Sequence, residues 1–421
     1  MKNVLFAASV CAAMFASAEI SVKSVAVSQD ATTRKVTVTY QLQGDETAGI
    51  VTVRFLDGAG AAIPEEKVMT LRGEVNARVS GLNANHSFVW NADADLPGID
   101  FTTQKLKAEV TVRPLSDPPE YMTADLRFSS CVRFYASSNA VPGGLSDPRY
   151  KMDVILMKRV LAKGVQWRMG TPSGESGRSS TRETLHYVTF TNDFYMGIYE
   201  ITQRQYRHLQ KSNLFSDFLG RADADVLPMN ALSYDHLRGP MSTSYKYYWP
   251  NCGHDVANDS YLGLLRARTG VLFDLPTDAQ WEYVCRAGVA TIYPDGSAQG
   301  ADNLGKFAWN SGNTTEPQPV GTRLPNRWGF YDMLGNVFEH TLDYHADMSS
   351  DSVTEPVGPY QKDGTVSVGA NRVSRGGSYK QDYTVCRPGV RNKGSTQGRY
   401  DRTGNQDEGA RLWAPIDVFV K

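Results

Sequence analysis

The stretch LPTDAQWEYVCRAG, residues 275–288, carries the clearest local signal in the chain. Thr277 is placed to cap the start of a helix, and Gln280, three residues later, can hydrogen-bond back to the cap residue, which is a capping box. Gly288 suits the left-handed conformation in which many helices end. The stretch therefore predicts one short helix with defined ends.

A second window, residues 200–206, repeats this pattern, because Thr202 is followed three residues later by Gln205. The rest of the region after residue 150 is rich in Gly, Asn, Tyr and Trp and has only short helical windows. Two short helices in so large a region imply much irregular backbone, which side-chain hydrogen bonds, bound ions or disulfides must fix. We therefore expect a loop-rich, mixed α+β domain over residues 151–421.

Residues 19–115 follow a different pattern, with a period of two. Val36, Val38, Tyr40 and Leu42 alternate with polar residues, which is typical of strands with one wet face. Turn signals at Asp57-Gly58, Gly81 and Pro97-Gly98 separate these strands. The pattern predicts a small antiparallel β-sandwich of the immunoglobulin or fibronectin type III kind. It would serve as a docking module for a partner, or as a spacer.

Residues 116–150 contain Pro118-Pro119 and Pro142-Gly143-Gly144 and have little periodicity, so we expect a linker there. The chain of 421 residues is long enough for two domains. Its 44 basic and 45 acidic side chains leave a formal net charge of −1. This balance gives no electrostatic reason to expect nucleic acid or an anionic membrane as a partner.

The N-terminus reads as an export signal. Met1-Lys2-Asn3 is followed by an apolar run too short to span a bilayer, and Ala16-Ser17-Ala18 offers small residues for cleavage after Ala18. A lipid anchor on Cys11 is disfavoured, because Ala8-Ser9-Val10 lacks the usual preceding residues. No other apolar stretch is long enough for a membrane helix. We therefore expect residues 1–18 to be removed and the protein to be periplasmic or secreted.

Four cysteines follow the signal: Cys131, Cys252, Cys285 and Cys386. In an oxidising compartment they could form two disulfides, and the sequence does not choose among the possible pairings. None lies in a CxxC pair, and the seven histidines form no HxH, HExxH or HxxxH motif. Dithiol redox chemistry and a histidine zinc or iron site are therefore disfavoured.

A series of short motifs runs in order from Gly164 to Arg411. They are Trp167-Arg168-Met169-Gly170, Glu183 with His186, Tyr199-Glu200-Ile201-Thr202, the 275–288 run, Pro319-Val320-Gly321, Pro325-Asn326, the 329–339 run GFYDMLGNVFE, Arg375-Gly376-Gly377-Ser378-Tyr379 and Gly409-Ala410-Arg411. In number, order and spacing they resemble the sulfatase-modifying-factor, or formylglycine-generating enzyme, family. That resemblance implies a C-type-lectin-related fold for residues 151–421. The fold serves oxidases and plain binding proteins alike, so function has to be argued from the site.

The resemblance also implies a copper site. Formylglycine generators oxidise a cysteine of a target sulfatase with oxygen, using copper held by two cysteines, because Cu(I) prefers thiolates. In this chain the first cysteine position is Gln381 and the second is Cys386. An amide is a poor substitute for a thiolate, so copper is not expected to bind. Cys386 is then either a structural cysteine or a lone reactive thiol beside Arg387.

Other residues of the same segment are candidates through the resemblance. Ser378 matches a position near the substrate and oxygen pocket, so Cys386 and Ser378 are the catalytic candidates. Tyr379, Arg387 and Arg391 would line the pocket. The alternative is that all of them are structural, since this strand is shared by relatives that lack the chemistry.

The resemblance further implies calcium, bound by Asp332, Gly335, Val337 and Glu339, a set of hard oxygen ligands that suits Ca²⁺. Alternatively, Asp332 caps a turn and Glu339 pairs with an arginine. A second calcium position, around Asn303 and Leu304, lacks its Asp-x-Phe partner between residues 312 and 320.

Three functions fit these observations. The first is an exported non-oxidase member of the family that binds a sulfatase, a glycan or another surface partner. The second is formylglycine generation itself, through an altered metal site or a thiol other than Cys386. The third is a lectin-like receptor that uses residues 392–406 as a variable binding surface, because Asn, Gly, Arg, Gln and Tyr are suited to adaptable contacts.

Overall fold

The computed structural model describes residues 20–99, 101, 105–129, 131–210, 218, 220–239, 256–356, 371–394 and 406–416. The predicted export signal, Cys252 and most of the 392–406 segment lie outside these ranges. The chain forms two compact units: residues 1–65 with 73–118, and residues 66–72 with 119–421. No helix in the described part of the chain is both long and apolar enough to cross a membrane.

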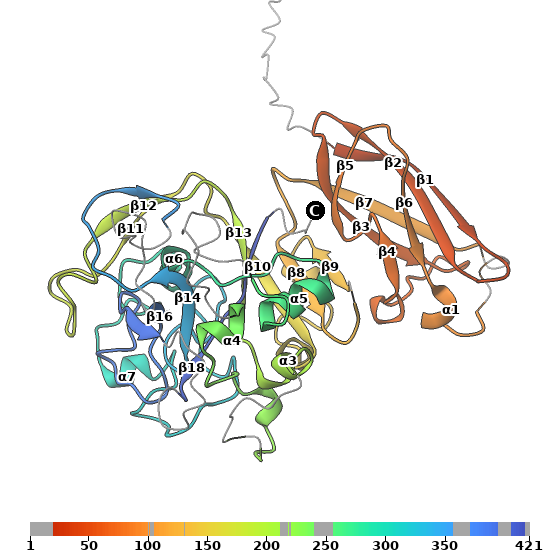
Figure 1. Cartoon of the computed structure of the whole chain (residues 1–421). Helices are drawn as coiled ribbons and strands as arrows, with labels where there is room; N and C mark the ends of the chain where they lie inside the picture. Colours follow the sequence, from red (N-terminus) through yellow and green to blue (C-terminus); the bar gives the residue numbers. More distant parts are fainter. Residues whose placement is uncertain are drawn as a thin grey trace, which may run out of the picture. The chain divides into compact units, whose positions relative to one another are not determined.

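The smaller unit is built from antiparallel strands, as the alternating pattern predicts (Figure 1). Val36, Val38, Tyr40 and Leu42 are all buried, whereas Thr39 between them is exposed. One sheet has the order β1 (Ile20–Gln29), β2 (Val36–Gly44), β6 (His86–Trp90), β4 (Leu71–Gly73), and the other has the order β5 (Ala77–Ser80), β3 (Ala48–Leu56), β7 (Lys107–Pro114). The immunoglobulin-like identity of this unit stays a prediction.

In the part of the chain that the structure describes, the larger unit contains three sheets. The five-stranded sheet runs β19 (Trp413–Pro415), β13 (Phe194–Gly197), β10 (Val154–Val160), β8 (Tyr121–Asp125), β9 (Val132–Tyr135); the three-stranded sheet runs β11 (Gln166–Met169), β12 (His186–Thr189), β15 (Val353–Thr354); the four-stranded sheet runs β17 (Asn392–Gly394), β16 (Arg372–Arg375), β14 (Phe338–Tyr344), β18 (Glu408–Gly409). Residues 116–150, expected to be a linker, thus contain β8 and β9, which pair with each other and, through β8, with β10.

Few helices accompany these sheets. Among its described residues, the α-helices of the larger unit are α3 (Gln203–Arg207), α4 (Tyr234–Arg238), α5 (Tyr261–Thr269), α6 (Asp278–Arg286) and α7 (Ala301–Leu304). Both predicted capping boxes are confirmed, at Thr202 for α3 and at Thr277 for α6. The left-handed end of α6 begins one residue earlier than predicted, at Ala287, and Gly288 also has a positive φ. The larger unit is therefore mixed α and β, with more sheet than helix.

Helix α6 contributes several side chains to a hydrophobic cluster of the larger unit. Trp281, Val284 and Cys285 of this helix pack in the same cluster as Met333 and Cys386. The helix also approaches β11, β14 and β16, which belong to two different sheets. The two conspicuous motifs of the sequence, residues 275–288 and 376–386, thus meet in one core.

Candidate functional site

The segment that follows β16 begins with a glycine turn. Gly376 and Gly377 have φ angles of 90° and 78°. Residues other than glycine adopt such backbone angles only with strain. A Cβ atom on Gly377 would lie 2.5 Å from Cys386 Sγ and 2.9 Å from its Cα. The turn therefore needs glycine both for its conformation and to let Cys386 pack against it.

Cys386 is a fully buried thiol. Its Sγ lies 3.7 Å from the carbonyl oxygen of Ser378 and 3.8 Å from that of Gln381. Burial raises the pKa of this thiol to about 12, so the thiol is protonated near neutral pH. Cys386 and Cys285 form no disulfide within the described residues. A protonated, buried thiol is a weak nucleophile and a poor metal ligand.

The hydroxyl of Ser378 already has hydrogen-bond partners within the protein. Ser378 is fully buried, and its Oγ donates a hydrogen bond to the carboxylate of Asp407. The same Oγ accepts a hydrogen bond from the Lys380 backbone at 3.2 Å. Tyr379 is buried, and its backbone N–H donates to the Asn336 carbonyl oxygen at 2.8 Å. These two predicted site residues hold the turn in place.

Arg387, predicted to line a pocket, is fully buried and forms an ion-pair cluster. Its Nη1 lies 2.7 Å from Glu175 and 3.0 Å from Glu183, and its Nη2 donates to the Gly177 carbonyl oxygen at 2.9 Å. These carboxylates raise the pKa of Arg387, against the opposing effect of burial. Arg387 therefore ties the segment after Cys386 to the loop of residues 172–183.

Arg391 is buried in a second cluster. Its Nε donates to Asp278, at the start of α6, at 2.6 Å, and its Nη1 donates to the Ala346 carbonyl oxygen at 2.6 Å. Arg375 pairs with the same Asp278 and, at 2.9 Å, with Glu282. Residues 375 and 391 thus fasten the two ends of the segment to one helix.

Arg375 and Arg411 are two members of this network whose roles were not predicted from the sequence. Arg411 is fully buried and contacts both oxygens of Glu339, the nearest at 2.7 Å. It also donates to the carbonyl oxygens of Gly197, Ile198 and Tyr331. Both arginines lie within the motifs that carry the resemblance, so their position was visible in the sequence although their partners were not.

The predicted calcium loop is only partly suited to an ion. Asp332 is buried, its Oδ2 accepts a hydrogen bond from the Gly321 N–H at 2.6 Å, and its Oδ1 has no partner among the described residues. Glu339, at the other end, is occupied by Arg411 and by Trp281 Nε1 at 2.6 Å. One of the two predicted carboxylate ligands, Glu339, is thus paired in this structure, whereas Asp332 keeps one oxygen without a partner among the described residues; calcium at this loop stays a prediction.

A third acidic residue, Glu200, lies against the same loop and was not predicted. It is buried, and it accepts hydrogen bonds from Asn336 Nδ2 at 2.7 Å and from the Val337 N–H at 3.2 Å. Burial, together with the charges of Asp332 and Glu339, raises the pKa of Glu200 well above its usual range. Burial likewise raises the pKa of Asp332 to about 6.

The second expected calcium position lies in α7, where Asn303 Nδ2 donates to the Ala298 carbonyl oxygen at 3.0 Å.

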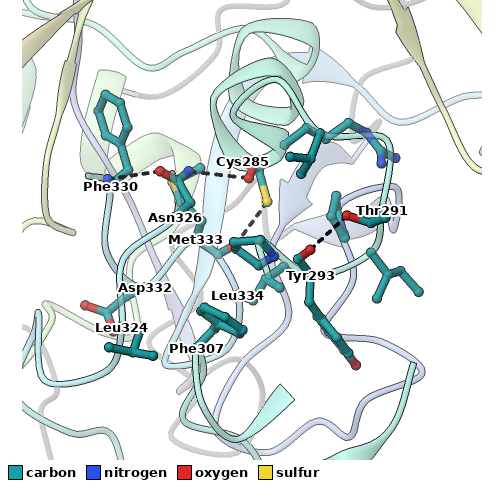
Figure 2. A pocket seen from close by; sticks show the side chains of 15 residues that line it. Cys285, Thr291, Tyr293, Phe307, Leu324, Asn326, Phe330, Asp332, Met333 and Leu334 are labelled. Carbon is teal, nitrogen blue, oxygen red and sulfur yellow. Dashed lines mark hydrogen bonds between the residues drawn. The ribbon is translucent and has the colours of Figure 1, made fainter. Parts of the chain in front are cut away.

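A small cavity lies beside this loop (Figure 2). Cys285, Asn326, Phe330 and Met333 are among its lining residues, and its volume of about 20 Å³ leaves room for about one water molecule. Asn326 Nδ2 donates to the Val284 carbonyl oxygen at 2.7 Å, and Cys285 Sγ lies 3.8 Å from the Met333 carbonyl oxygen. Burial raises the pKa of Cys285 to about 12. The cavity is too small for a substrate.

Comparison with known proteins matches most of the larger unit to one family. The family described as Sulfatase-modifying factor enzyme 1-like domain matches residues 156–405. The formylglycine-generating enzyme of Mus musculus is 26% identical over 294 residues, which cover 61% of this chain and 75% of the mouse protein. The chaperone protein LppX of Paenibacillus barcinonensis is 25% identical over 248 residues, which cover 52% of this chain and 80% of that protein.

Two solved structures are also similar. Variable protein 1 of Treponema denticola has a TM-score of 0.46 and 22% identity, with 62% of this chain and 95% of that chain covered. PvdO from Pseudomonas aeruginosa has a TM-score of 0.46 and 23% identity, with 62% and 94% covered.

Proposed function

Since the chain belongs to the family of the sulfatase-modifying factor enzyme 1-like domain, we propose that it is an exported non-oxidase member that binds or assists a sulfatase, a glycan or another surface partner. The single observation that carries this proposal is the state of Cys386. Copper oxidation in this family needs two thiolates, and this chain offers one buried thiol whose pKa is raised to about 12.

The residue at the other copper position supports the same conclusion. Gln381 matches the first cysteine position of the family segment, and its carbonyl oxygen lies 3.8 Å from Cys386 Sγ. The amide of Gln381 is a neutral, hard donor and does not replace a thiolate. The donor set at this position therefore does not fit copper, and no step of the proposed function passes through it.

The buried arginines stabilise the fold of the domain, which supports a structural and not a catalytic role for them. Arg375, Arg387, Arg391 and Arg411 are each paired with carboxylates, so the predicted pocket residues Arg387 and Arg391 hold backbone segments together. The similar proteins include one named a chaperone as well as formylglycine-generating enzymes. The chaperone name of that similar protein supports an accessory function for this chain. Calcium at the Asp332 loop stays a prediction, and the proposed function does not depend on it.

The direct test is an oxidation assay. The purified protein, loaded with Cu(I) under oxygen, is incubated with a peptide containing the Cys-x-Pro-x-Arg motif of sulfatases, and mass spectrometry detects conversion of the cysteine to formylglycine. The bovine formylglycine-generating enzyme, 27% identical over 296 residues, is the positive control. We expect no conversion by this protein. Turnover comparable to that of the control would show that the chain is an oxidase.

A further inference from the structure

A larger hollow lies between the end of α6 and β11. Its volume is about 510 Å³, which is within the usual range for small-molecule sites. Trp167 and Arg168 come from β11, Tyr283 and Arg286 from α6, and Gly288 and Ala290 from the loop after α6. None of these residues belongs to the segment around Cys386 or to the predicted calcium loop.

One wall of the hollow is aromatic and fixed in place. The rings of Trp167 and Tyr283 lie 5.4 Å apart, and the Tyr283 ring also packs edge-on against Trp328 at 5.0 Å. The Tyr283 hydroxyl donates to the Leu161 carbonyl oxygen at 2.9 Å. Trp167 stacks on Phe190 with ring centroids 6.3 Å apart. Because packing already holds these rings in place, the protein loses little side-chain entropy when a ligand contacts them.

The junction between β11 and α6 is clamped at Gly170. The Gly170 N–H donates to Glu282 at 2.9 Å, and its carbonyl oxygen accepts from Arg286 Nη2 at 2.7 Å. Gly170 has a φ of 101°, and a Cβ atom there would lie 2.6 Å from the Thr184 carbonyl oxygen. The strand that carries Trp167 and Arg168 is therefore positioned rigidly against the helix that carries Tyr283.

The charge of the hollow is positive. Its lining includes two arginines and no aspartate or glutamate. Arg286 is balanced by Glu282, whose Oε1 lies 2.8 Å from Arg286 Nε. Arg168 is exposed, and within the described part of the chain its guanidinium has no hydrogen-bond or ion-pair partner. An unpaired guanidinium in a hollow that is also lined by aromatic side chains favours a ligand that carries a carboxylate or sulfate group.

We propose that this hollow binds an anionic sugar ring, a uronic acid or a sulfated monosaccharide unit. The apolar C–H face of the ring lies on Trp167 and Tyr283, its hydroxyl edge faces the open side, and its anionic group pairs with Arg168. A sugar matches the hollow because both have one apolar face and a polar rim, formed here by Arg168 and the exposed Ser173. The assignment rests on the proposed binding function and gives that function a ligand class.

The test uses the full mature chain and four probes: glucuronate, glucose 6-sulfate, uncharged glucose, and benzoate as an anion without a sugar ring. Binding is followed by titration calorimetry and by ligand-observed NMR. The variants are Arg168→Ala, which removes the unpaired charge, and Ala290→Phe, which fills the hollow from an exposed position. Lys163→Ala is the matched control, because it removes an exposed positive charge just before β11 from a residue outside the lining.

We expect at least one anionic sugar to bind more tightly than glucose and benzoate. Arg168→Ala should weaken that binding about tenfold or more, which is the effect of losing one charge-assisted contact, and Ala290→Phe should abolish it. Lys163→Ala should bind as the wild type does. The proposal is wrong if neither anionic sugar binds at about 10 mM, if glucose or benzoate binds equally well, or if Arg168→Ala leaves the affinity unchanged. Failure here leaves the oxidation assay unaffected, so it does not by itself overturn the non-oxidase function.

Discussion

At the scale of single residues, the environment of Cys386 decides more than its identity does. The sequence alone left it open whether Cys386 is structural or reactive. Its Sγ contacts two carbonyl oxygens, and its burial raises the pKa of the thiol to about 12. Arg387, the neighbour expected to activate it, points its guanidinium to Glu175 and Glu183. The side chain that would lower the thiol pKa is therefore paired elsewhere.

Restoring the second sulfur should restore copper affinity. Gln381→Cys restores the second cysteine of the family pattern, at a residue whose backbone carbonyl oxygen lies 3.8 Å from Cys386 Sγ. We expect this variant to hold Cu(I) about tenfold or more tightly than the wild type in competition with a chromophoric chelator, since a pair of thiolates suits Cu(I). Lys380→Cys adds a thiol at the exposed neighbouring position and is the control. Equal affinities for the two variants would contradict the assignment of position 381.

Arg411 should be indispensable for stability. In Arg411→Met, the buried Glu339 loses its ionic partner and keeps only the Trp281 hydrogen bond, while Glu200 and Asp332 remain nearby, so charge is left uncompensated. Breaking one side of a buried ion pair typically costs about 3–5 kcal/mol. We expect a loss of that order in the free energy of unfolding of the larger unit, measured by urea denaturation with tryptophan fluorescence. Arg168→Met, at an exposed arginine, should change it by less than about 0.5 kcal/mol.

Asp332 predicts a dependence of stability on pH. Burial raises the pKa of this carboxyl in the folded protein from 3.8 to about 6. The folded state therefore binds the proton more tightly than the unfolded state, and stability falls as pH rises from about 4 to above 6. In Asp332→Asn this contribution is absent, so the variant should be more stable than the wild type at pH ~7.5 by about 3 kcal/mol, and the difference should shrink towards pH ~4. Thermal unfolding with a chelator present measures it. A variant that is less stable at both pH values would point to an essential ionised carboxylate.

At the scale of elements, local signals were predictable and long-range ones were not. The caps of α3 and α6 follow from residues three positions apart, and both are present. Strands β8 and β9 were not predicted from the sequence, because every residue in them is buried. They therefore lack the alternation of polar and apolar residues that marks a half-exposed strand. The arginine clusters join residues such as Arg387 and Glu183, which are 204 positions apart. No periodicity connects residues at that distance.

The cap of α6 allows a direct test of its share in stability. The Thr277 hydroxyl accepts a hydrogen bond from the Gln280 N–H, and the Thr277 N–H donates one to Gln280 Oε1 at 2.9 Å. Thr277→Ala removes the first of these bonds and should cost about 1 kcal/mol. Thr277→Ser keeps the hydroxyl and should cost much less. If the two variants lose equal stability in urea denaturation, the methyl group of Thr277 and not its hydroxyl is important.

At the scale of the whole molecule, the order of the motifs predicted the family, and the match to residues 156–405 confirms it. The domain organisation beyond the family match, the export signal and the partner stay predictions. The two ends of the segment of residues 375–391 are fastened to α6 through Arg375 and Arg391, and a functional site in this segment stays a prediction. Its chemistry was not visible in the sequence, because which carboxylate pairs with which arginine depends on the tertiary structure.

The central claim is that the scaffold is kept while the copper chemistry is lost. Metal analysis of the full chain tests it most directly: the reduced protein is loaded with Cu(I), dialysed, and its copper content measured per chain, with Gln381→Cys treated in parallel. We predict that the wild type retains far less than one copper per chain, because a single buried thiol remains at the site. Near-stoichiometric copper in the wild type, together with conversion of the sulfatase peptide, would contradict the claim.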